Sequence, residues 1–449
     1  MRRTLTGTLV ALMILTLGIT GAWANGSQEG AGQREGVAAE NPTDNPWTNG
    51  EDLSGTTVNI FGAFVEPGSD FFRESLDYFE EQTGITVNYT GSGDFESLIS
   101  VRVEGGDPPD IAAFPQPGVL QDFVMRDAVV DLNQWFTEEY LLEHYDQSWL
   151  DIATMEGIMA GVWYRANVKS LVWYPVPEFQ EAGYEIPETW DEMMELTEQM
   201  AEDGNTPWSI GIESSGATGW VATDWLEDIM LRTATPEKYD QWVEGELDFD
   251  SSEVRRAMNI MAEIWKNEDY VLGGVNSILT VPFGDAPNPL FRDPPRAYLH
   301  RQASFITDFF PEDAVVGEDV DFFYLPPIDE EEGRAVLGAG DIFAAFEDRP
   351  EVAAVMRYLT TGRSIKPWVE SGGVVAPHKD AKLSWYPTEA NRRYAEILQN
   401  ADTFRFDASD MMPGQVGAGA FWSQMVSWVN GKSIDETLEA IDESWPEEE

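Results

Sequence analysis

The sequence predicts an α/β fold in which strands and helices alternate along the chain. Thr56–Phe61 is rich in β-branched residues, which is typical of a strand. Residues 69–84 then place large apolar side chains at helical spacing until a glycine, and Ile85–Tyr89 begins a second strand. A strand, a helix and a strand in this order favour a parallel sheet whose faces are covered by helices.

The alternation continues further along the chain. A proline pair at 108–109 forces an extended approach to a third strand, Asp110–Phe114. Val168–Tyr174 is interpreted as one continuous apolar strand. Thr189–Met200 is interpreted as a helix, because two acidic residues stand in its first turn.

The N-terminus has the features of a secretion signal. Two arginines precede a short apolar run, Leu9–Leu17, and Ala22-Trp23-Ala24 fits a small-x-small cleavage site. We therefore expect a signal peptide over residues 1–24, and a flexible leader over residues 25–52, which have almost nothing to bury. Since the chain contains no cysteine, the mature protein is expected in the periplasm or outside the cell, without a lipid anchor.

The length of the chain after the expected leader and its net charge limit the possible functions. Roughly 400 residues follow the expected leader, too many for one hydrophobic core and about right for two. The chain has 27 basic and 81 acidic residues, a net charge of −54, and the acids are spread over its whole length. Nucleic-acid binding is therefore excluded. A surface this acidic and poor in lysine favours adaptation to high external salt; the alternative is an ordinary acidic exported protein.

Several segments resemble the family 1 extracellular solute-binding proteins, the maltose-binding-protein-like cluster, and especially its α-glucoside-uptake members. They are Phe79–Val87, Val103–Ile111, Lys169–Tyr174 and Glu188–Glu192, in the family's order. In one departure, Tyr174 is followed by Pro175 where the family usually has Asn.

The resemblance implies a type II-like periplasmic-binding-protein fold, with two lobes that are each a sheet flanked by helices. Strands that cross between the lobes near Val168, Ala335 and Gly373 would form the hinge. The N-terminal lobe would then comprise residues 53–167 and 336–372, and the C-terminal lobe residues 168–335 and 373–449. The function implied is that of a monomeric substrate-binding protein, which carries a carbohydrate to the membrane permease subunits of an ABC importer and has no cofactor.

Sugar sites pair aromatic platforms with polar groups, and open α/β sheets bind ligands beyond the carboxyl ends of their strands. Phe64 and Glu66 follow the first strand, and Gln116 lies between two prolines after the third. Lys169 stands at the expected crossing, and Asp341 follows a glycine-rich stretch. For each of them the alternative is structural, namely a turn that faces water, a tight strand turn or an ion pair.

Further candidates come from the second half of the chain. Trp220 and Asp224 lie where a loop enters a helix, and Arg301 follows an apolar stretch. Trp422 ends a glycine- and alanine-rich loop within a helical segment expected from residue 419 to 428, so an indole there has room for a flat ligand. The alternatives are a helix N-terminal charge for Asp224, a surface ion pair for Arg301 and a core position for Trp422. Another helix is expected from Ser433, with a glutamate at its capping-box position.

Motifs of catalysis are missing from the sequence. There is no G-x-S-x-G, no H-E-x-x-H and no cysteine, and the only histidines are His144, His300 and His378. We therefore expect a binding protein without metal or cofactor. Two alternatives stay open: a binding protein for another small solute such as a polyamine, and a secreted glycoside hydrolase whose two carboxylates are unrecognisable among 81 acids. The sequence does not name the sugar or its linkage.

Overall fold

Strands and helices alternate along the chain as predicted. The computed structural model describes residues 45–399 and 401–446. Its strands are β1 (Thr57–Gly62), β2 (Thr86–Gly91), β3 (Ile111–Phe114), β4 (Thr154–Met155), β5 (Ile158–Met159), β6 (Val162–Val168), β7 (Leu171–Pro175), β8 (His300–Arg301), β9 (Val320–Tyr324), β10 (Ala335–Ala345) and β11 (Thr403–Phe406).

The helices of the described residues lie between these strands and after the last of them. The α-helices are α1 (Gly68–Thr83), α2 (Phe95–Glu104), α3 (Pro117–Val124), α4 (Glu138–His144), α5 (Gln147–Ala153), α6 (Val176–Glu181), α7 (Trp190–Glu202), α8 (Trp220–Met230), α9 (Pro236–Val243), α10 (Ser252–Trp265), α11 (Pro350–Leu359), α12 (Gly362–Ser371), α13 (Glu389–Gln399), α14 (Ala408–Met411), α15 (Trp422–Val429) and α16 (Ile434–Asp442). Short 3₁₀ segments are η1 (Leu132–Gln134), η2 (Ser215–Ala217), η3 (Val275–Leu279), η4 (Asn288–Phe291), η5 (Ser304–Phe309), η6 (Glu330–Glu332) and η7 (Leu383–Trp385), and η8 (Gln415–Phe421) is a π-helix.

The predicted strand–helix–strand unit is confirmed. β1 and β2 pair in parallel, and α1 between them buries Phe72, Leu76 and Phe79 on one stripe. Gly84 ends α1 in a left-handed conformation, with a φ of 68°, that a residue without Cβ adopts at little cost. The predicted capping box is present at Ser433, at the start of α16, and α7 starts with a capping box at Thr189 that was not predicted.

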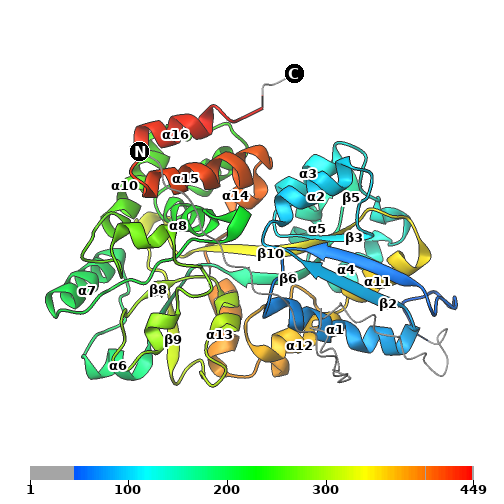
Figure 1. Ribbon diagram of the computed structural model, residues 1–449, viewed down its shortest axis with the longest axis horizontal. Coiled ribbons are helices and arrows are strands. Elements are labelled where there is room, and N and C mark those ends of the chain that lie inside the picture. Colours follow the sequence, from blue (N-terminus) through cyan, green and yellow to red (C-terminus); the bar gives the residue numbers. More distant parts are fainter. Residues whose placement is uncertain (1–44, 400, 447–449) are drawn as a thin grey trace, which may run out of the picture. The chain divides into compact units, whose positions relative to one another are not determined.

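The larger sheet has six strands in the order β11-β10-β3-β1-β2, with β6 paired to β10. β1 is parallel to β2 and β3, whereas β10 is antiparallel to β3 and β6 and parallel to β11. Helices lie on both sides of this sheet, with α1 and α12 on one side and α2 and α3 on the other (Figure 1). A smaller antiparallel sheet has the order β8-β7-β9.

The buried side chains of the described residues form three hydrophobic clusters. The first surrounds most of the larger sheet, the second contains α8, α10 and α15, and the third lies around β7 and β9. β10 takes part in all of them: Ala335 and Leu337 belong to the second cluster, Val336 to the third, and Ala339 and Ile342 to the first. A single strand therefore connects all three clusters.

The segment predicted as one strand, Val168–Tyr174, is two strands, and that prediction is wrong in this detail. β6 ends at Val168 and pairs with β10, whereas β7 starts at Leu171 and pairs with β9. The break falls at Lys169, whose side chain is buried and bonded to carboxylates far away in the sequence. Pro175 closes β7, and α6 follows directly.

The expected leader is partly folded, so the prediction that the fold begins near Leu53 is also wrong. Trp47 is buried in the first cluster, and its ring centroid lies 5.9 Å from those of Tyr78 and Phe79 and 5.1 Å from that of Tyr358. An indole placed this way adds aromatic edge contacts to apolar burial. The expected signal peptide, residues 1–24, and the leader up to residue 44 lie outside the described residues.

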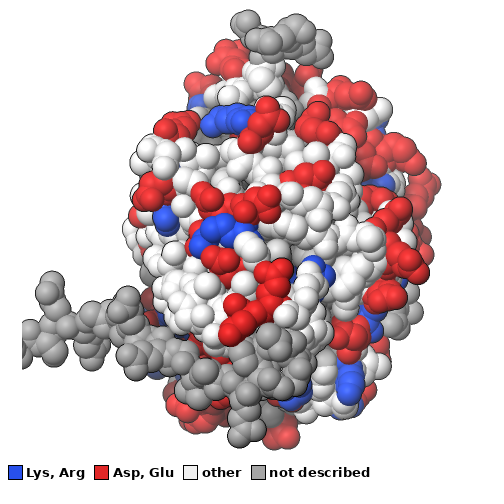
Figure 2. Space-filling view, turned by 90° about the vertical axis from the view of Figure 1, so that its right-hand side faces the viewer, with Lys and Arg blue, Asp and Glu red and all other residues white. Residues whose placement is uncertain are grey.

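Acidic side chains are dispersed over the surface. Figure 2 shows Asp and Glu across most of the face it displays, with fewer Lys and Arg among them. Within the part of the chain that the structure describes, no helix has both the length and the apolar character needed to cross a membrane.

Candidate functional site

A pocket with a volume of about 180 Å³ lies where the ends of β1 and β3 meet residues of η2, α8 and α15. We call it the aromatic pocket, because seven of its lining side chains are aromatic: Phe64, Trp220, Phe283, Phe305, Phe309, Trp368 and Trp422. Apolar walls with a few polar groups are the usual composition of a small-molecule site.

Six of the nine predicted contact residues are brought together in this pocket. They come from six separate places in the chain: Phe64, Gln116, Lys169, Trp220, Asp341 and Trp422. The placement follows the expectation that loops at the carboxyl ends of parallel strands meet at one edge of a sheet. Whether each of them touches a ligand stays a prediction.

Three predicted contact residues do not line the aromatic pocket. Glu66 is exposed in the loop before α1. Asp224 is fully buried on α8, where its carboxylate accepts a hydrogen bond from Lys169 across 2.8 Å. Arg301 is also buried and donates to Asp228 across 2.7 Å, so its guanidinium is neither in the pocket nor at the surface. The charged groups of Asp224 and Arg301 point into the protein, where each is paired with a group of opposite charge.

Arg165 is the pocket residue that the sequence analysis missed. Its guanidinium carbon lies 4.4 Å from the ring centroid of Phe64 and 4.6 Å from that of Trp368, so the cation is held against two aromatic rings. Its Nε also donates to Asp341, which is almost completely buried. The only sequence signal was a charged residue within the mostly apolar strand β6, and the sequence does not show which carboxylate would pair with it.

Three buried oxygen atoms at this pocket have no hydrogen-bond partner in the structure. They are Gln116 Oε1, Asn167 Oδ1 and Asp341 Oδ1, and all three residues line the pocket. A buried acceptor without a donor costs about 1–3 kcal/mol, so a ligand that supplies hydroxyl donors would remove this cost. Three polar residues that line the pocket therefore each retain one acceptor oxygen without a donor.

Trp422 is buried, yet it belongs to none of the three hydrophobic clusters of the described residues. Its neighbour Phe421 is in the second cluster, as expected for adjacent residues that point about 100° apart on a helix. Gly219, with a φ of 124°, lies against the Trp422 backbone: a Cβ at this position would be 2.4 Å from the Trp422 carbonyl oxygen. This close approach brings Trp220, at the start of α8, to the same pocket.

A buried charge network lies behind the pocket wall. Lys169 Nζ donates to Asp224 and to Asp407, and it lies 4.0 Å from Asp410. Glu227 accepts hydrogen bonds from the backbone amides of Ala408 and Ser409, across 3.1 Å in each case. Lys169 and Asp410 also line the pocket, so the network extends to the binding surface.

The pKa values of the residues in this network are shifted in both directions. Burial opposes the charge of Lys169, but Asp224 and Asp407 hold its pKa well above the usual range. Burial likewise opposes ionisation of Asp407, but the Lys169 ammonium holds the pKa of that carboxyl below its usual range. Burial raises the pKa of Asp224 to about 7 and that of Glu227 well above its usual range. Neighbouring carboxyls of this network therefore have pKa values that are shifted in opposite directions.

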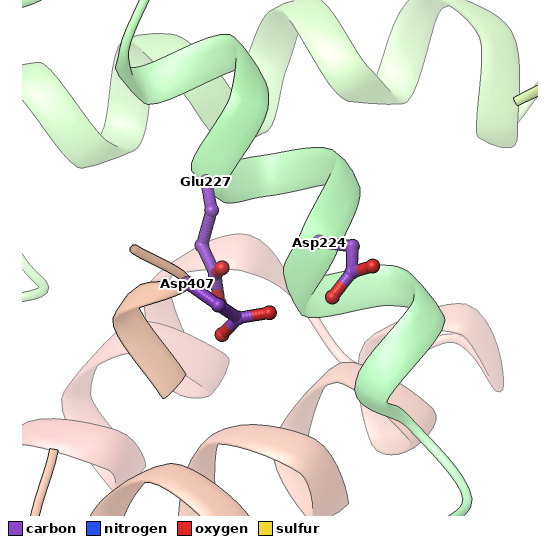
Figure 3. A group of neighbouring side chains, drawn as sticks. All are labelled: Asp224, Glu227 and Asp407. Carbon is purple, nitrogen blue, oxygen red and sulfur yellow. The ribbon is translucent and has the colours of Figure 1, made fainter. Parts of the chain in front are cut away.

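Asp224, Glu227 and Asp407 are the one group among the described residues whose spacing would suit a metal ion (Figure 3). The Lys169 ammonium is already bonded to two of them, Asp224 and Asp407, and provides the positive charge that a metal would bring. The geometry therefore favours an internal ion-pair network over a metal site.

Two further acidic side chains face the pocket. Burial raises the pKa of Glu96 to about 7, although the residue as a whole is only half-buried. Burial also raises the pKa of Asp308 to about 6, and its carboxylate accepts a hydrogen bond from Trp368 Nε1 across 2.8 Å. Neither was singled out from the sequence, because nothing distinguishes them among 81 acids.

Comparison with known proteins gives a consistent result. The family described as "Bacterial extracellular solute-binding protein" matches residues 65–361. The chain is 47% identical over 401 residues to the osmoprotective compounds-binding protein GgtB of Synechocystis sp., covering 89% of this chain and 95% of that protein. It is 42% identical over 405 residues to the alpha-glucosides-binding periplasmic protein AglE of Rhizobium meliloti, covering 88% of each.

Solved structures share the fold at low sequence identity. The bacterial solute receptor AcbH, described as preferring β-D-galactopyranose, superposes with a TM-score of 0.75 at 17% identity, over 87% of this chain and 97% of that one. A maltose-bound structure of T. maritima MalE3 superposes with a TM-score of 0.69 at 16% identity, over 87% of this chain and 98% of that one. The predicted α/β fold is therefore confirmed.

Proposed function

Because this chain belongs to the bacterial extracellular solute-binding protein family, we propose that it captures a neutral glycoside in the aromatic pocket and delivers it to the permease of an ABC importer. Two relatives support this class of ligand: GgtB is named for osmoprotective compounds and AglE for α-glucosides. Family membership also confirms the prediction of a binding protein rather than an enzyme.

The three unpaired acceptors carry the proposal. Gln116, Asn167 and Asp341 require donors, and aromatic rings surround them on the pocket walls. A sugar offers several hydroxyl donors on its edge and apolar C–H groups on its faces, so one molecule satisfies both kinds of wall. An apolar ligand would leave the acceptors unpaired.

The charges on the pocket wall favour a neutral ligand over a polyamine. Arg165 and Lys169 place two cations there, and each is already bonded to carboxylates. Among the other acids that line the pocket, burial raises the pKa of Glu96 to about 7, that of Asp308 to about 6 and that of Asp410 well above its usual range, which favours their neutral forms. A polycation needs the opposite arrangement, with ionised carboxylates and no competing cations.

We also propose that the chain forms two lobes that close on the ligand. One comprises residues 53–167 and 336–372, with the segment around Trp47 packed on it, and the other residues 168–335 and 373–449. Two strands that connect the hydrophobic clusters support this proposal. β6 runs from Val162 in the first cluster to Val168 in the third, and β10 has residues in all three clusters. Closure is favoured only when both lobes contact the ligand. The radius of gyration in solution scattering is expected to fall at saturating ligand, and an unchanged radius would reject closure.

Export as a free protein is part of the proposal. The family is extracellular by description, and AglE is named as periplasmic. We therefore propose that the predicted signal peptide, residues 1–24, directs the chain out of the cytoplasm, and that a monomer without a lipid anchor meets the permease there. Mass spectrometry of the secreted chain should find Asn25 as its first residue.

Thermal shift with a panel of neutral glycosides and one polyamine tests the ligand class. A ligand at about 100 times its Kd stabilises the protein by about 2.7 kcal/mol, so a bound glycoside should raise Tm clearly and spermidine should not. Gln116→Ala should weaken the response to the glycoside. Gln199→Ala, on the exposed face of α7, is the matched control and should leave it intact. A response to spermidine alone would replace the glycoside with a polyamine.

A further inference from the structure

One side of α8 carries side chains that lead from the aromatic pocket into the protein interior. Trp220, Asp224 and Asp228 follow one another at intervals of four residues, and Arg232 continues this spacing just after the helix. Residues four apart lie on the same face of a helix, and Arg232 forms an ion pair with Asp228. Trp220 lines the pocket, whereas the other three are completely buried. We call these four residues the α8 stripe.

The connection between the larger and the smaller sheet is bonded to the α8 stripe. It consists of Lys169 and Ser170, which follow β6 and precede β7. Lys169 Nζ donates to Asp224 across 2.8 Å and lies 5.6 Å from the ring centroid of Trp220. Ser170 is completely buried, and its hydroxyl donates to Asp228 across 2.7 Å. Both residues of the connection are therefore held by α8.

The start of β10 is held by the far end of the same stripe. Arg232 Nη2 donates to the carbonyl of Ala335, the first residue of β10, across 3.0 Å. The amide of Leu337 donates to the Ser170 hydroxyl across 2.9 Å, so this part of β10 is also bonded to the first connection. We call residues 169–170 and 335–337 the crossing segments. Asp228 and Arg232 thus hold both crossing segments at one place.

Ionic groups dominate this place in the interior. Asp228 accepts hydrogen bonds from Ser170, from Arg232 and, across 2.7 Å, from Arg301. Burial opposes the charge of Asp228, but the guanidinium groups of Arg232 and Arg301 hold its pKa below the usual range. Apolar residues of similar volume often give a protein the same stability as a buried ion pair, whereas charged hydrogen bonds also specify one geometry. The ionic groups therefore suit positioning better than stabilisation.

We infer that Ser170, Asp228 and Arg232 are positioning residues for solute binding, because they fix the crossing segments to α8, whose first residue, Trp220, is part of the pocket wall. This inference rests on the proposed function, in which two lobes close on the solute, and it adds the element that links the pocket to the crossing segments. None of the three positioning residues lines the pocket. Release of the crossing segments lowers the fraction of molecules in the binding-competent arrangement, and the apparent Kd rises in inverse proportion to that fraction.

Ser170→Ala tests the inference through affinity. It removes the bond to Asp228 and the acceptor of the Leu337 amide, and Ser170 does not line the pocket. Isothermal titration calorimetry uses whichever of methyl α-D-glucopyranoside, maltose, trehalose and sucrose gives the largest thermal shift, and Kd for this probe is expected to rise fivefold or more. The matched control is Ser209→Ala, which removes a buried hydroxyl of the same proposed lobe that donates to the Ala286 carbonyl across 2.6 Å. It should lower Tm and leave Kd unchanged.

A second measurement needs no solute. Since the chain has no cysteine, two introduced cysteines carry spin labels at defined positions. Val101→Cys on α2 and Glu439→Cys on α16 are exposed positions, one in each proposed lobe, and neither lines the pocket. The distribution of distances between the two labels in the solute-free protein is expected to broaden in Ser170→Ala and in Asp228→Asn, and to stay unchanged in Ser209→Ala.

The outcomes of the two measurements are distinct. A Kd or a distance distribution that stays at the control's value in a folded Ser170→Ala protein would overturn the inference, because the bonds of the stripe would then serve stability alone. Asp228→Asn replaces Ser170→Ala in both measurements if the latter is poorly folded by its Tm. If the wild type binds none of the probes, the proposed function fails, and the distance distributions still decide whether the stripe positions the crossing segments.

Discussion

Trp422 donates its indole hydrogen to the hydroxyl of Ser409 across 3.2 Å, and that hydroxyl donates in turn to Asp407 across 2.9 Å. The orientation of the ring is thereby linked to the buried network around Lys169, which is bonded to Asp407. The Trp422 ring of the aromatic pocket is therefore held by hydrogen bonds as well as by packing.

The first prediction concerns this link. Ser409→Ala leaves the Trp422 indole nitrogen without its acceptor, so we expect a loss of glycoside affinity of about 1 kcal/mol, roughly fivefold. Isothermal titration calorimetry measures this loss of affinity, and the emission maximum of the indole fluorescence should shift. Ser423→Ala, at an exposed position of α15, is the matched control. Unchanged affinity in Ser409→Ala would show that packing alone orients the ring.

The second prediction separates platform from core. Trp422→Ala should lower glycoside affinity by tenfold or more and cost little stability, because Trp422 belongs to no hydrophobic cluster. Phe421→Ala should show the opposite pattern, a loss of about 3–5 kcal/mol in the free energy of unfolding, since Phe421 is fully buried in the second cluster. Urea denaturation measures the free energy of unfolding of both variants, and titration calorimetry measures their glycoside affinity. A destabilised Trp422→Ala protein that still responds to ligand would assign Trp422 to the core.

The third prediction concerns the ion-pair network. Lys169→Met leaves Asp407 without a cation in the interior and leaves Asp224 with only Arg301, 3.6 Å away, so we expect a loss of about 3–5 kcal/mol in the free energy of unfolding. Lys366→Met removes a lysine from an exposed pair with Glu370 and should change stability by about 0.5 kcal/mol or less. Equal effects of the two substitutions in urea denaturation would reject a stabilising role for the network.

The fourth prediction is a pH dependence of stability. The pKa of Glu96 is raised by burial from its usual 4.5 to about 7, so the folded state binds this proton more tightly than the unfolded state does. Its contribution to stability is complete below about pH 4.5 and is lost as pH rises to about 7. Glu96→Gln should therefore reduce the pH dependence by up to about 1.4 kcal/mol per pH unit across this window. Identical pH profiles of the two proteins in urea denaturation would contradict the raised pKa.

The fifth prediction follows from the net charge of −54. Carboxylates dispersed over the surface repel one another in dilute buffer, and salt screens this repulsion, with a Debye length of about 10 Å at 0.1 M and about 3 Å at 1 M (Figure 2). Tm should therefore rise from low salt to molar sodium chloride. A flat curve would contradict adaptation to a saline medium.

The sequence was most informative where the signals are local. The apolar stripe of α1, its terminal glycine and the capping box of α16 depend on residues within a few positions of one another, and all are present. The break at Lys169 was missed, because it depends on β10 and β9 as separate partners of β6 and β7. Trp47 was missed because one indole in a polar stretch gives no periodic pattern.

The candidate site, like the fold, was predicted only in part from the sequence. Loop position at the strand ends was enough to find Phe64, Gln116 and Asp341, since the fold itself brings these ends together. Asp224 was expected at the site because it lies where a loop enters a helix, and Arg301 because it follows an apolar stretch, but neither signal reveals the partner of the charge. Their partners, Lys169 and Asp228, are 55 and 73 residues away in the sequence.

The position of β10 also has a consequence for biosynthesis. β10 lies next to β3 in the sheet, yet it follows β3 in the chain only after all of β7, β8 and β9. A ribosome delivers β1, β2 and β3 early, and the edge of β3 that pairs with β10 has no native partner until Ala345 has been made. The larger sheet therefore cannot be completed until translation has passed Ala345, long after its first three strands have been made.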